Sequence, residues 1–192
     1  MKKSLILALL LTGCATPGTE TRNPDPKQVE EMRAAAKTLA TQLGGKLKAE
    51  MEANGPEAAV GVCKKIAPQI AADLSKQTGW KVGRVGTRAR NPESGTPDAW
   101  NAKALAVFSE RMKKGEKPDA MELAEVVTER SGSYLRYAKA IAVQPLCVTC
   151  HGSPKDIPEG VKARLQAEYP MDQATGYSLG ALRGAVVVKR PL

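Results

Sequence analysis

Apolar residues recur at helical spacing through the first third of the chain. Between residues 28 and 52 they follow one another at steps of three and four, namely Met32, Ala36, Leu39, Leu43, Leu47 and Met51. The residues Asn-Gly-Pro-Glu at 54–57 interrupt this pattern, and proline suits the first turn of a following helix. A second stripe then extends to Thr78 through Ala59, Cys63, Ile66, Ile70 and Leu74. The pattern predicts two amphipathic helices, with Cys63 facing the core.

The second half of the chain contains short segments rich in β-branched residues. Such segments predict strands at 80–85, 122–129, 133–143 and 184–190. Ser131-Gly132-Ser133 suits a hairpin turn between the middle two strands. A proline-rich loop and a helix from about Asp98 to Lys113, with Asp98 or Pro97 near its cap, separate the first two strands. A loop that contains residues 147–151 and then a short helix precede the last strand. We therefore expect helices followed by a small sheet in one domain.

The N-terminal residues have the pattern of a secretory signal. Two lysines precede an apolar run from Leu5 to Leu11, which is too short to span a bilayer. Thr12-Gly13-Cys14 follows and resembles the lipobox of bacterial lipoproteins, in which the cysteine becomes the acylated first residue. An ordinary signal peptide with an incidental Cys14 is the alternative. We expect a signal peptide at 1–13, a flexible tether at 14–27 and one domain at 28–192, anchored by lipid at the periplasmic face of the outer membrane.

Composition and charge exclude two classes of protein. The formal net charge is +9, but the 29 basic residues are dispersed, with no basic run of five and no set of aromatic residues for stacking on bases. This pattern argues against a nucleic-acid-binding protein. No later apolar run approaches the roughly 18 residues of a membrane span, so we expect no transmembrane receptor.

The motif Cys147-Val148-Thr149-Cys150-His151 is typical of c-type haem attachment. Two thiols at this spacing can each add to a vinyl group while the imidazole of the next residue binds the iron. A disulfide and half of a zinc site are the alternatives. Zinc normally takes four nitrogen or sulfur ligands, but the chain has no second CxxC motif and no second histidine. The motif therefore predicts one covalently attached haem c, with His151 as one axial ligand.

The second axial ligand is open on the residues alone. Cys63 is left without a partner once Cys14 is assigned to lipid and the motif cysteines to haem. It is either a small buried apolar residue or a thiolate ligand of the iron. Pro68 lacks an N–H for the carbonyl of Lys64 and predicts a bend one turn beyond Cys63. The competing ligands are Met32, Met51, Met112, Met121 and Met171.

Four segments resemble, in order, a family of small c-haem proteins first described in cyanobacteria. They are VCKKIAPQIAADLS, GRVGTRARNPESGTPDAW, CVTCHGS and YPMDQATGYSLGALRGAVVVKRPL, and the resemblance covers residues 28–192. That family also supplies periplasmic haem-sensor domains to bacterial histidine kinases and chemoreceptors. The resemblance implies an α+β fold, with a PAS-like antiparallel sheet flanked by N-terminal helices. It also implies one haem c with histidine and cysteine ligands, which correspond here to His151 and Cys63. The chain departs from the family pattern at residues 93–96 and at Asn101.

Two functions follow from these expectations. One is a redox or gas sensor in which Cys63 leaves the iron, and the other is a low-potential electron carrier anchored by lipid. Either would act with an unidentified redox or signalling protein. We do not expect an enzyme, because no second histidine is available for acid–base chemistry. Arg84 and Arg90 are candidates for contacts with the haem propionates, with plain surface arginines as the alternative.

Overall fold

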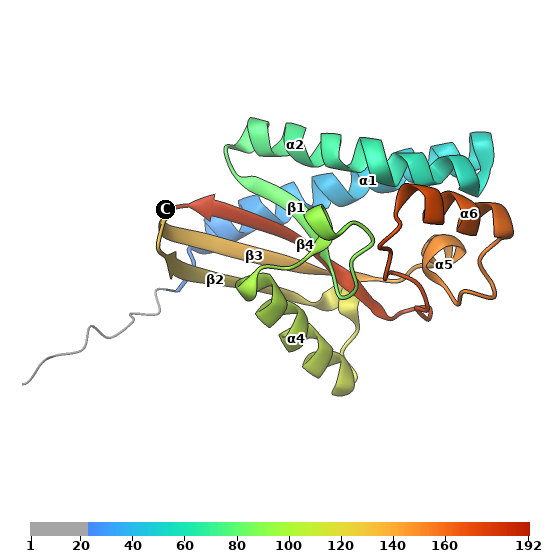
Figure 1. The fold of residues 1–192 in the computed structure, drawn as a ribbon. Coiled ribbons are helices and arrows are strands. Elements are labelled where there is room, and N and C mark those ends of the chain that lie inside the picture. The colour runs from blue at the N-terminus through green and yellow to red at the C-terminus, as the bar shows by residue number, and fades with distance from the viewer. Residues whose placement is uncertain (1–22) are drawn as a thin grey trace, which may run out of the picture.

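One antiparallel sheet organises the protein. The computed structural model describes residues 23–192, so the predicted signal peptide and Cys14 lie outside the described residues. The strands are β1 (Lys81–Gly86), β2 (Glu122–Glu129), β3 (Gly132–Ala142) and β4 (Leu182–Pro191), in the order β1-β4-β3-β2 (Figure 1). The predicted strands are therefore confirmed, with every strand end within two residues of its predicted position, and so is the hairpin turn between β2 and β3.

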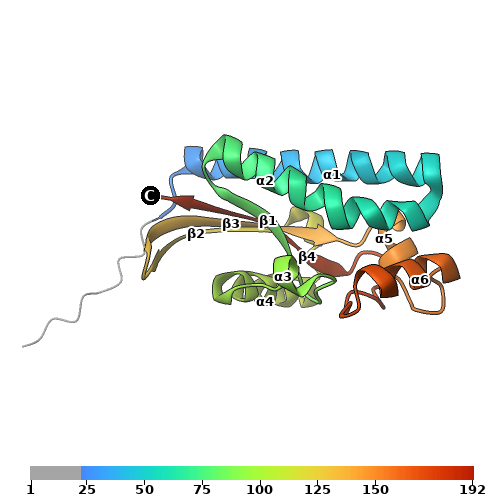
Figure 2. The same ribbon diagram turned by 45° about the horizontal axis from the view of Figure 1, so that its top comes forward.

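Helices surround this sheet on both faces and at one end. They are α1 (Pro26–Gly61), η1 (Val62–Ile66), α2 (Ala67–Thr78), α3 (Pro92–Gly95), α4 (Ala99–Lys113), η2 (Pro118–Ala120), α5 (Pro145–His151) and α6 (Glu159–Glu168). Helices α1 and α2 cover one face, α4 lies on the other, and α5 and α6 lie beyond one end (Figure 2). This is the predicted α+β class. Within the described residues no helix is both long and apolar enough for a membrane span.

The core forms on both faces of the sheet, because side chains alternate along each strand. On one face, Met32 and Leu39 of α1 pack with Leu135 and Val188. On the other face, a second cluster packs α4 against β3 and β4; its largest members are Trp100, Phe108 and Met121. The sheet is therefore packed on both faces, and the segment between β3 and β4 extends from it.

The predicted break between the first two helices appears as a kink. Gly55 has φ +82°, a backbone conformation that glycine adopts without steric cost, and Pro56 begins the next helical turn. The chain then continues as helix through η1 to Thr78. Two long helical arms therefore lie side by side on the sheet (Figures 1 and 2).

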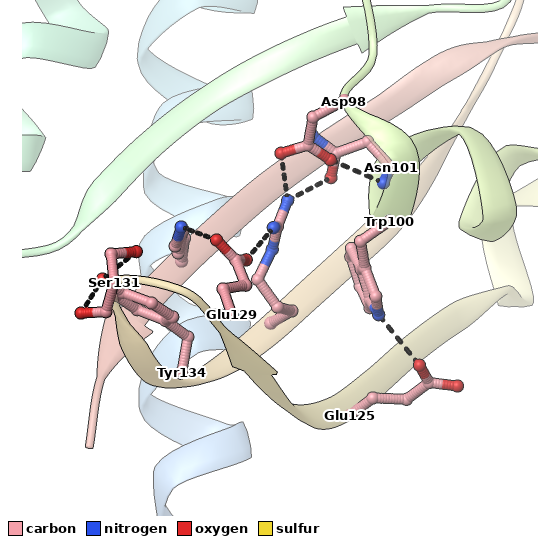
Figure 3. Close-up of polar contacts among 9 residues, drawn as sticks. Asp98, Trp100, Asn101, Glu125, Glu129, Ser131 and Tyr134 are labelled. Carbon is pink, nitrogen blue, oxygen red and sulfur yellow. Dashed lines mark hydrogen bonds and ion pairs between the residues drawn. The ribbon is translucent and has the colours of Figure 1, made fainter.

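A buried charge network attaches α4 to the sheet (Figure 3). Arg136 of β3 is only 4% exposed and donates hydrogen bonds to Glu129 at 2.7 Å and to Asp98 at 2.6 Å. Its guanidinium lies 5.0 Å from the centre of the Trp100 ring. Asp98 also caps α4 by accepting a hydrogen bond from the backbone N–H of Asn101 at 2.9 Å, as the sequence predicts. The arginine is paired with two carboxylates, as a buried cation requires.

The loop at which the chain departs from the family pattern forms the single turn α3. Asn91 caps this turn by accepting a hydrogen bond from the N–H of Glu93 at 3.1 Å, and the Thr96 hydroxyl donates to the carbonyl of Pro92 at 2.6 Å. At the other departure, the side-chain oxygen of Asn101 accepts a hydrogen bond from Arg136 at 3.2 Å. Glu93, Thr96 and Asn101, which lie at the departures from the family pattern, are therefore hydrogen-bonded within the fold.

The insertion between β3 and β4, residues 143–181, forms the end of the molecule that carries α5 and α6 (Figure 1). Two backbone hydrogen bonds close its base: Val143 N–H donates to Ala181 O at 2.9 Å, and Gly180 N–H donates to Val143 O at 2.8 Å. The insertion is therefore fixed to the sheet at both ends.

Candidate functional site

The attachment motif lies on the short helix α5. The sequence predicts a loop here, and this prediction is wrong: Pro145 begins a helical turn, which closes where Gly152 N–H donates to Val148 O at 2.8 Å. A spacing of three residues places Cys147 and Cys150 on the same side of a helix. The helix therefore presents both thiols together, with His151 one turn beyond Cys147.

The motif thiols are free in the structure. Cys63, Cys147 and Cys150 are half-buried and unbridged. Within residues 23–192, no group of three or more histidine, cysteine or acidic side chains is arranged to hold a metal ion. The described residues therefore form neither the disulfide nor the protein-only zinc site that the sequence left as alternatives.

The ring of His151 is held in one tautomer. Its Nδ1 lies 2.6 Å from the carbonyl oxygen of Ala174. Since a carbonyl only accepts, Nδ1 carries the proton and Nε2 keeps its lone pair. Burial, together with the charges of Arg90 and Arg183, lowers the pKa of His151 to about 2, so the ring is neutral at physiological pH. A neutral imidazole with Nδ1 bound to a backbone carbonyl is the usual arrangement of a histidine metal ligand.

Residues 168–177, which we call the strap, run along this histidine. Tyr177 N–H donates to His151 O at 2.9 Å and Gly176 N–H donates to Gly152 O at 2.6 Å. The Tyr177 ring also meets the imidazole edge-on, with 6.3 Å between the ring centres. The strap therefore fixes both the backbone and the side chain of His151.

Arg90 joins the strap to α5. It is 8% exposed, and its Nε donates to Asp172 at 2.9 Å. Its Nη2 donates to the carbonyl of Cys150 at 2.5 Å. Arg90 is therefore not the surface arginine that the sequence left as an alternative. Its partners are those of a structural brace between the motif helix and the strap.

Cys63 lies in a π-helical turn. The turn η1 closes where Ala67 N–H donates to the carbonyl of Val62, five residues earlier. Pro68 has no N–H for the carbonyl of Lys64, which explains a change of hydrogen-bonding register in this place. The predicted disturbance at Pro68 is thus a π turn that contains Cys63. Single π turns within α-helices are frequent at functional sites.

The π turn also alters which side chains are buried. Ile66 is 40% exposed, whereas its neighbours Val62 and Ala67 are buried. The expectation that Cys63 and Ile66 share a stripe that faces the core is therefore wrong, because the extra residue in the turn rotates the stripe. Cys63 is half-buried. Burial raises the pKa of Cys150 and lowers the pKa of Arg84, and a thiolate at Cys63 would raise both. Cys63 therefore lies near the motif helix and β1.

A salt bridge ties the Cys63 turn to the strap. Lys64, the next residue, lies 2.5 Å from a carboxylate oxygen of Glu168 and donates to the backbone carbonyl of Glu168 at 3.1 Å. The adjacent Tyr169 is buried, and burial together with the charge of Cys63 raises its pKa to about 12. The strap therefore contacts the π turn that contains Cys63 at its start, through Glu168, and contacts His151 at its end, through Tyr177.

Two further arginines, Arg84 and Arg183, lie close to this site. Arg84 is exposed to solvent, yet the protein surrounds it closely enough for desolvation to lower its pKa. Arg183, at the start of β4, is half-buried, and burial lowers its pKa as well. The sequence did not single out Arg183, because the predicted strand began one residue later, at Gly184.

A separate cavity of about 430 Å³ opens beside α5. Its lining residues are Val148, Thr149, Gly152, Ser153, Asp156, Pro158, Tyr177 and Ser178. None of the predicted site residues lines it.

Comparisons with known proteins bear on the fold and the family of the chain. A search of curated proteins finds no match. A solved structure described as the cyanobacterial haem protein Tll0287 is similar in fold, with a TM-score of 0.62 and 24% sequence identity. The match covers 88% of this chain and 97% of that chain. The PAS-like description stays a prediction. The model of the Tll0287-like family matches residues 20–191, and the chain therefore belongs to the Tll0287-like family.

Proposed function

We propose that the protein binds one haem c, attached through Cys147 and Cys150 and ligated by His151. The observation that carries this proposal is the geometry of α5, which presents two free thiols beside a neutral histidine whose Nε2 is available. The similar solved structure is that of a haem protein, which supports the same cofactor. A haem c bound here would supply a one-electron Fe(III)/Fe(II) couple.

The surrounding residues fit this cofactor. Cys63 would provide a soft sulfur ligand near the motif helix, and Arg84 on β1 would provide a positive charge. We therefore assign Cys63 as the second axial ligand.

The most direct function for this arrangement is redox or gas sensing. Release of Cys63 from iron would free the π turn, and the Lys64–Glu168 contact joins that turn to the strap that holds His151. A change at one ligand would therefore reach the elements around the other. If His151 and Cys63 both held the iron, no coordination position would be free for a substrate, so we do not propose an enzyme.

A second candidate is a low-potential electron carrier. Three apolar side chains on or beside the insertion are exposed: Leu146, Met171 and Leu179. Such a surface would suit transient contact with a redox protein. In this case both axial ligands would stay bound during turnover, which distinguishes the carrier from the sensor.

Covalent haem is tested by intact mass and a pyridine haemochrome spectrum. Protein from a host with haem c maturation should have the mass of the processed chain plus one haem, because two thioether bonds resist denaturation. Cys147→Ser and Cys150→Ser should each alter the haemochrome spectrum, since each removes one thioether. A wild-type mass without porphyrin would contradict the proposal.

Membrane anchoring is a separate proposal, based on the lipobox at Leu11–Cys14. More than one acyl chain is needed for stable anchoring, and a lipoprotein cysteine supplies them. Cys14→Ser should release the protein from membranes or block its maturation, as judged by fractionation and immunoblotting. If the variant fractionates with membranes as the parent does, the anchor lies elsewhere.

A further inference from the structure

More arginine side chains than carboxylates lie around His151. Arg90 donates to the carbonyl of Cys150, the residue before His151, and the guanidinium of Arg183 lies 5.3 Å from the centre of the Tyr177 ring, which meets the His151 ring edge-on. Asp172 forms an ion pair with Arg90 at 2.9 Å. Within residues 23–192, neither Arg84 nor Arg183 forms an ion pair. Two guanidinium groups are therefore left without a carboxylate.

Arg183 in addition has a buried donor without an acceptor. Its Nε is one of two buried side-chain polar atoms in the described part of the chain that lack a hydrogen-bond partner. The other belongs to Arg136, whose charge is balanced by Asp98 and Glu129. Arg183 has no such pair. A buried, unsatisfied donor on an unpaired cation is costly, which points to a ligand that completes it.

The protein contacts of Arg183 do not replace an anion. Its Nη1 donates to the carbonyl of Arg88 at 3.1 Å, and its guanidinium lies 5.3 Å from the centre of the Tyr177 ring. These contacts orient the side chain but do not neutralise it. Arg84 belongs to the adjacent strand, where it pairs with Val186, three residues after Arg183. The two arginines therefore extend from neighbouring strands near the end of the sheet where the insertion begins.

We propose that Arg84 and Arg183 together bind a pair of carboxylates, and that these are the two propionates of the haem. The inference rests on the proposed function, because that cofactor carries two carboxylates for two unmatched guanidinium groups. Guanidinium groups bind carboxylates through paired N–H donors, which a lysine would not reproduce. The sequence predicted Arg84 and Arg90 as the contacts of the propionates. We replace Arg90 with Arg183, because Arg90 already forms an ion pair with Asp172.

The test compares Arg84→Gln, Arg183→Gln and Arg183→Lys in the haem-loaded protein. Arg130→Gln is the control, because it removes the same charge from an exposed position at the β2–β3 turn. Propionate ionisation is followed by resonance Raman spectra and by the pH dependence of the reduction potential. An ion-paired carboxylate has a lowered pKa, so each glutamine variant should raise a propionate pKa by about one unit, a tenfold change in proton affinity. Arg183→Lys should have an intermediate effect.

The outcomes separate this inference from the proposed function. If all variants carry covalent haem but the propionates of Arg84→Gln and Arg183→Gln titrate as in Arg130→Gln, the arginine assignment is overturned and haem binding stands. If the wild type carries no haem, the proposed function fails first. Inorganic phosphate distinguishes a site for free anions: thermal stabilisation of the wild-type holoprotein by phosphate, lost in Arg183→Gln, would also overturn the propionate assignment.

Discussion

We expect Cys63→Ala to convert six-coordinate, low-spin ferric haem into a five-coordinate or water-ligated form and to raise the reduction potential. An anionic thiolate opposite imidazole donates electron density and favours Fe(III) over Fe(II). Removing it therefore favours the reduced state. The ferric absorption and electron paramagnetic resonance spectra report the ligation, and spectroelectrochemistry reports the potential.

A longer neutral ligand in the same place gives a graded result. Cys63→Met should keep six-coordinate iron at a higher potential than the wild type, because a thioether carries no charge and favours Fe(II). The π turn is the element that has to accommodate the larger side chain. In the wild type, reduction should make protonation and release of the thiolate easier.

Ile66→Ala is the matched control for these variants. It alters the same turn without removing a ligand, so its spectrum should remain that of the wild type. Of the five methionines that could instead bind the iron, Met32 and Met121 are fully buried in the two clusters on the faces of the sheet, and Met112 packs against one of these clusters. Met51 and Met171 remain, and Met171, which is 68% exposed, lies in the strap next to Asp172. An unchanged spectrum in Cys63→Ala but an altered one in Met171→Ala would refute the assignment.

The strands could be predicted from sequence because their signal is local. The β2–β3 hairpin has alternating side chains along two strands, and both strands lie within one residue of their predicted ends. The turn between them lies at residues 130–131, one residue before the predicted turn. The π turn could not be placed in this way. A stripe with steps of three and four looks the same with or without one extra residue per turn, and only Pro68 indicated a disturbance.

The roles of the arginines were equally inaccessible to sequence. Arg90 and its partner Asp172 are 82 positions apart, and no spacing rule connects them. That Arg183 has no carboxylate partner can be seen only in the folded structure, where the carboxylates pair with other residues. The motif predicts the covalent attachment and one ligand, whereas the balance of charge around His151 depends on the tertiary fold.

Asp172→Asn should lower the free energy of unfolding of the holoprotein by about 3 to 5 kcal/mol, because it leaves Arg90 buried without its counter-charge. Both side chains of this pair are nearly inaccessible, at 8% and 11% exposure. Urea titration followed by circular dichroism measures the change. Asp156→Asn is the control, since it removes the same charge from an exposed position in the same insertion and should change stability little.

Asp172→Leu separates the charge from a second contact of the same side chain. The other oxygen of Asp172 accepts a hydrogen bond from Ala174 N–H at 2.7 Å, and the Ala174 carbonyl in turn holds Nδ1 of His151. Asparagine retains that acceptor, whereas leucine removes it. Both variants should be destabilised, but the leucine variant should in addition alter the ferric spectrum by freeing the imidazole.

The double variant Arg90→Leu/Asp172→Leu should recover part of the stability, because no unpaired charge remains buried. The single variant Arg90→Leu completes the comparison. If the losses in free energy of unfolding of Arg90→Leu and Asp172→Leu simply add in the double variant, the pair does not act as the brace between α5 and the strap.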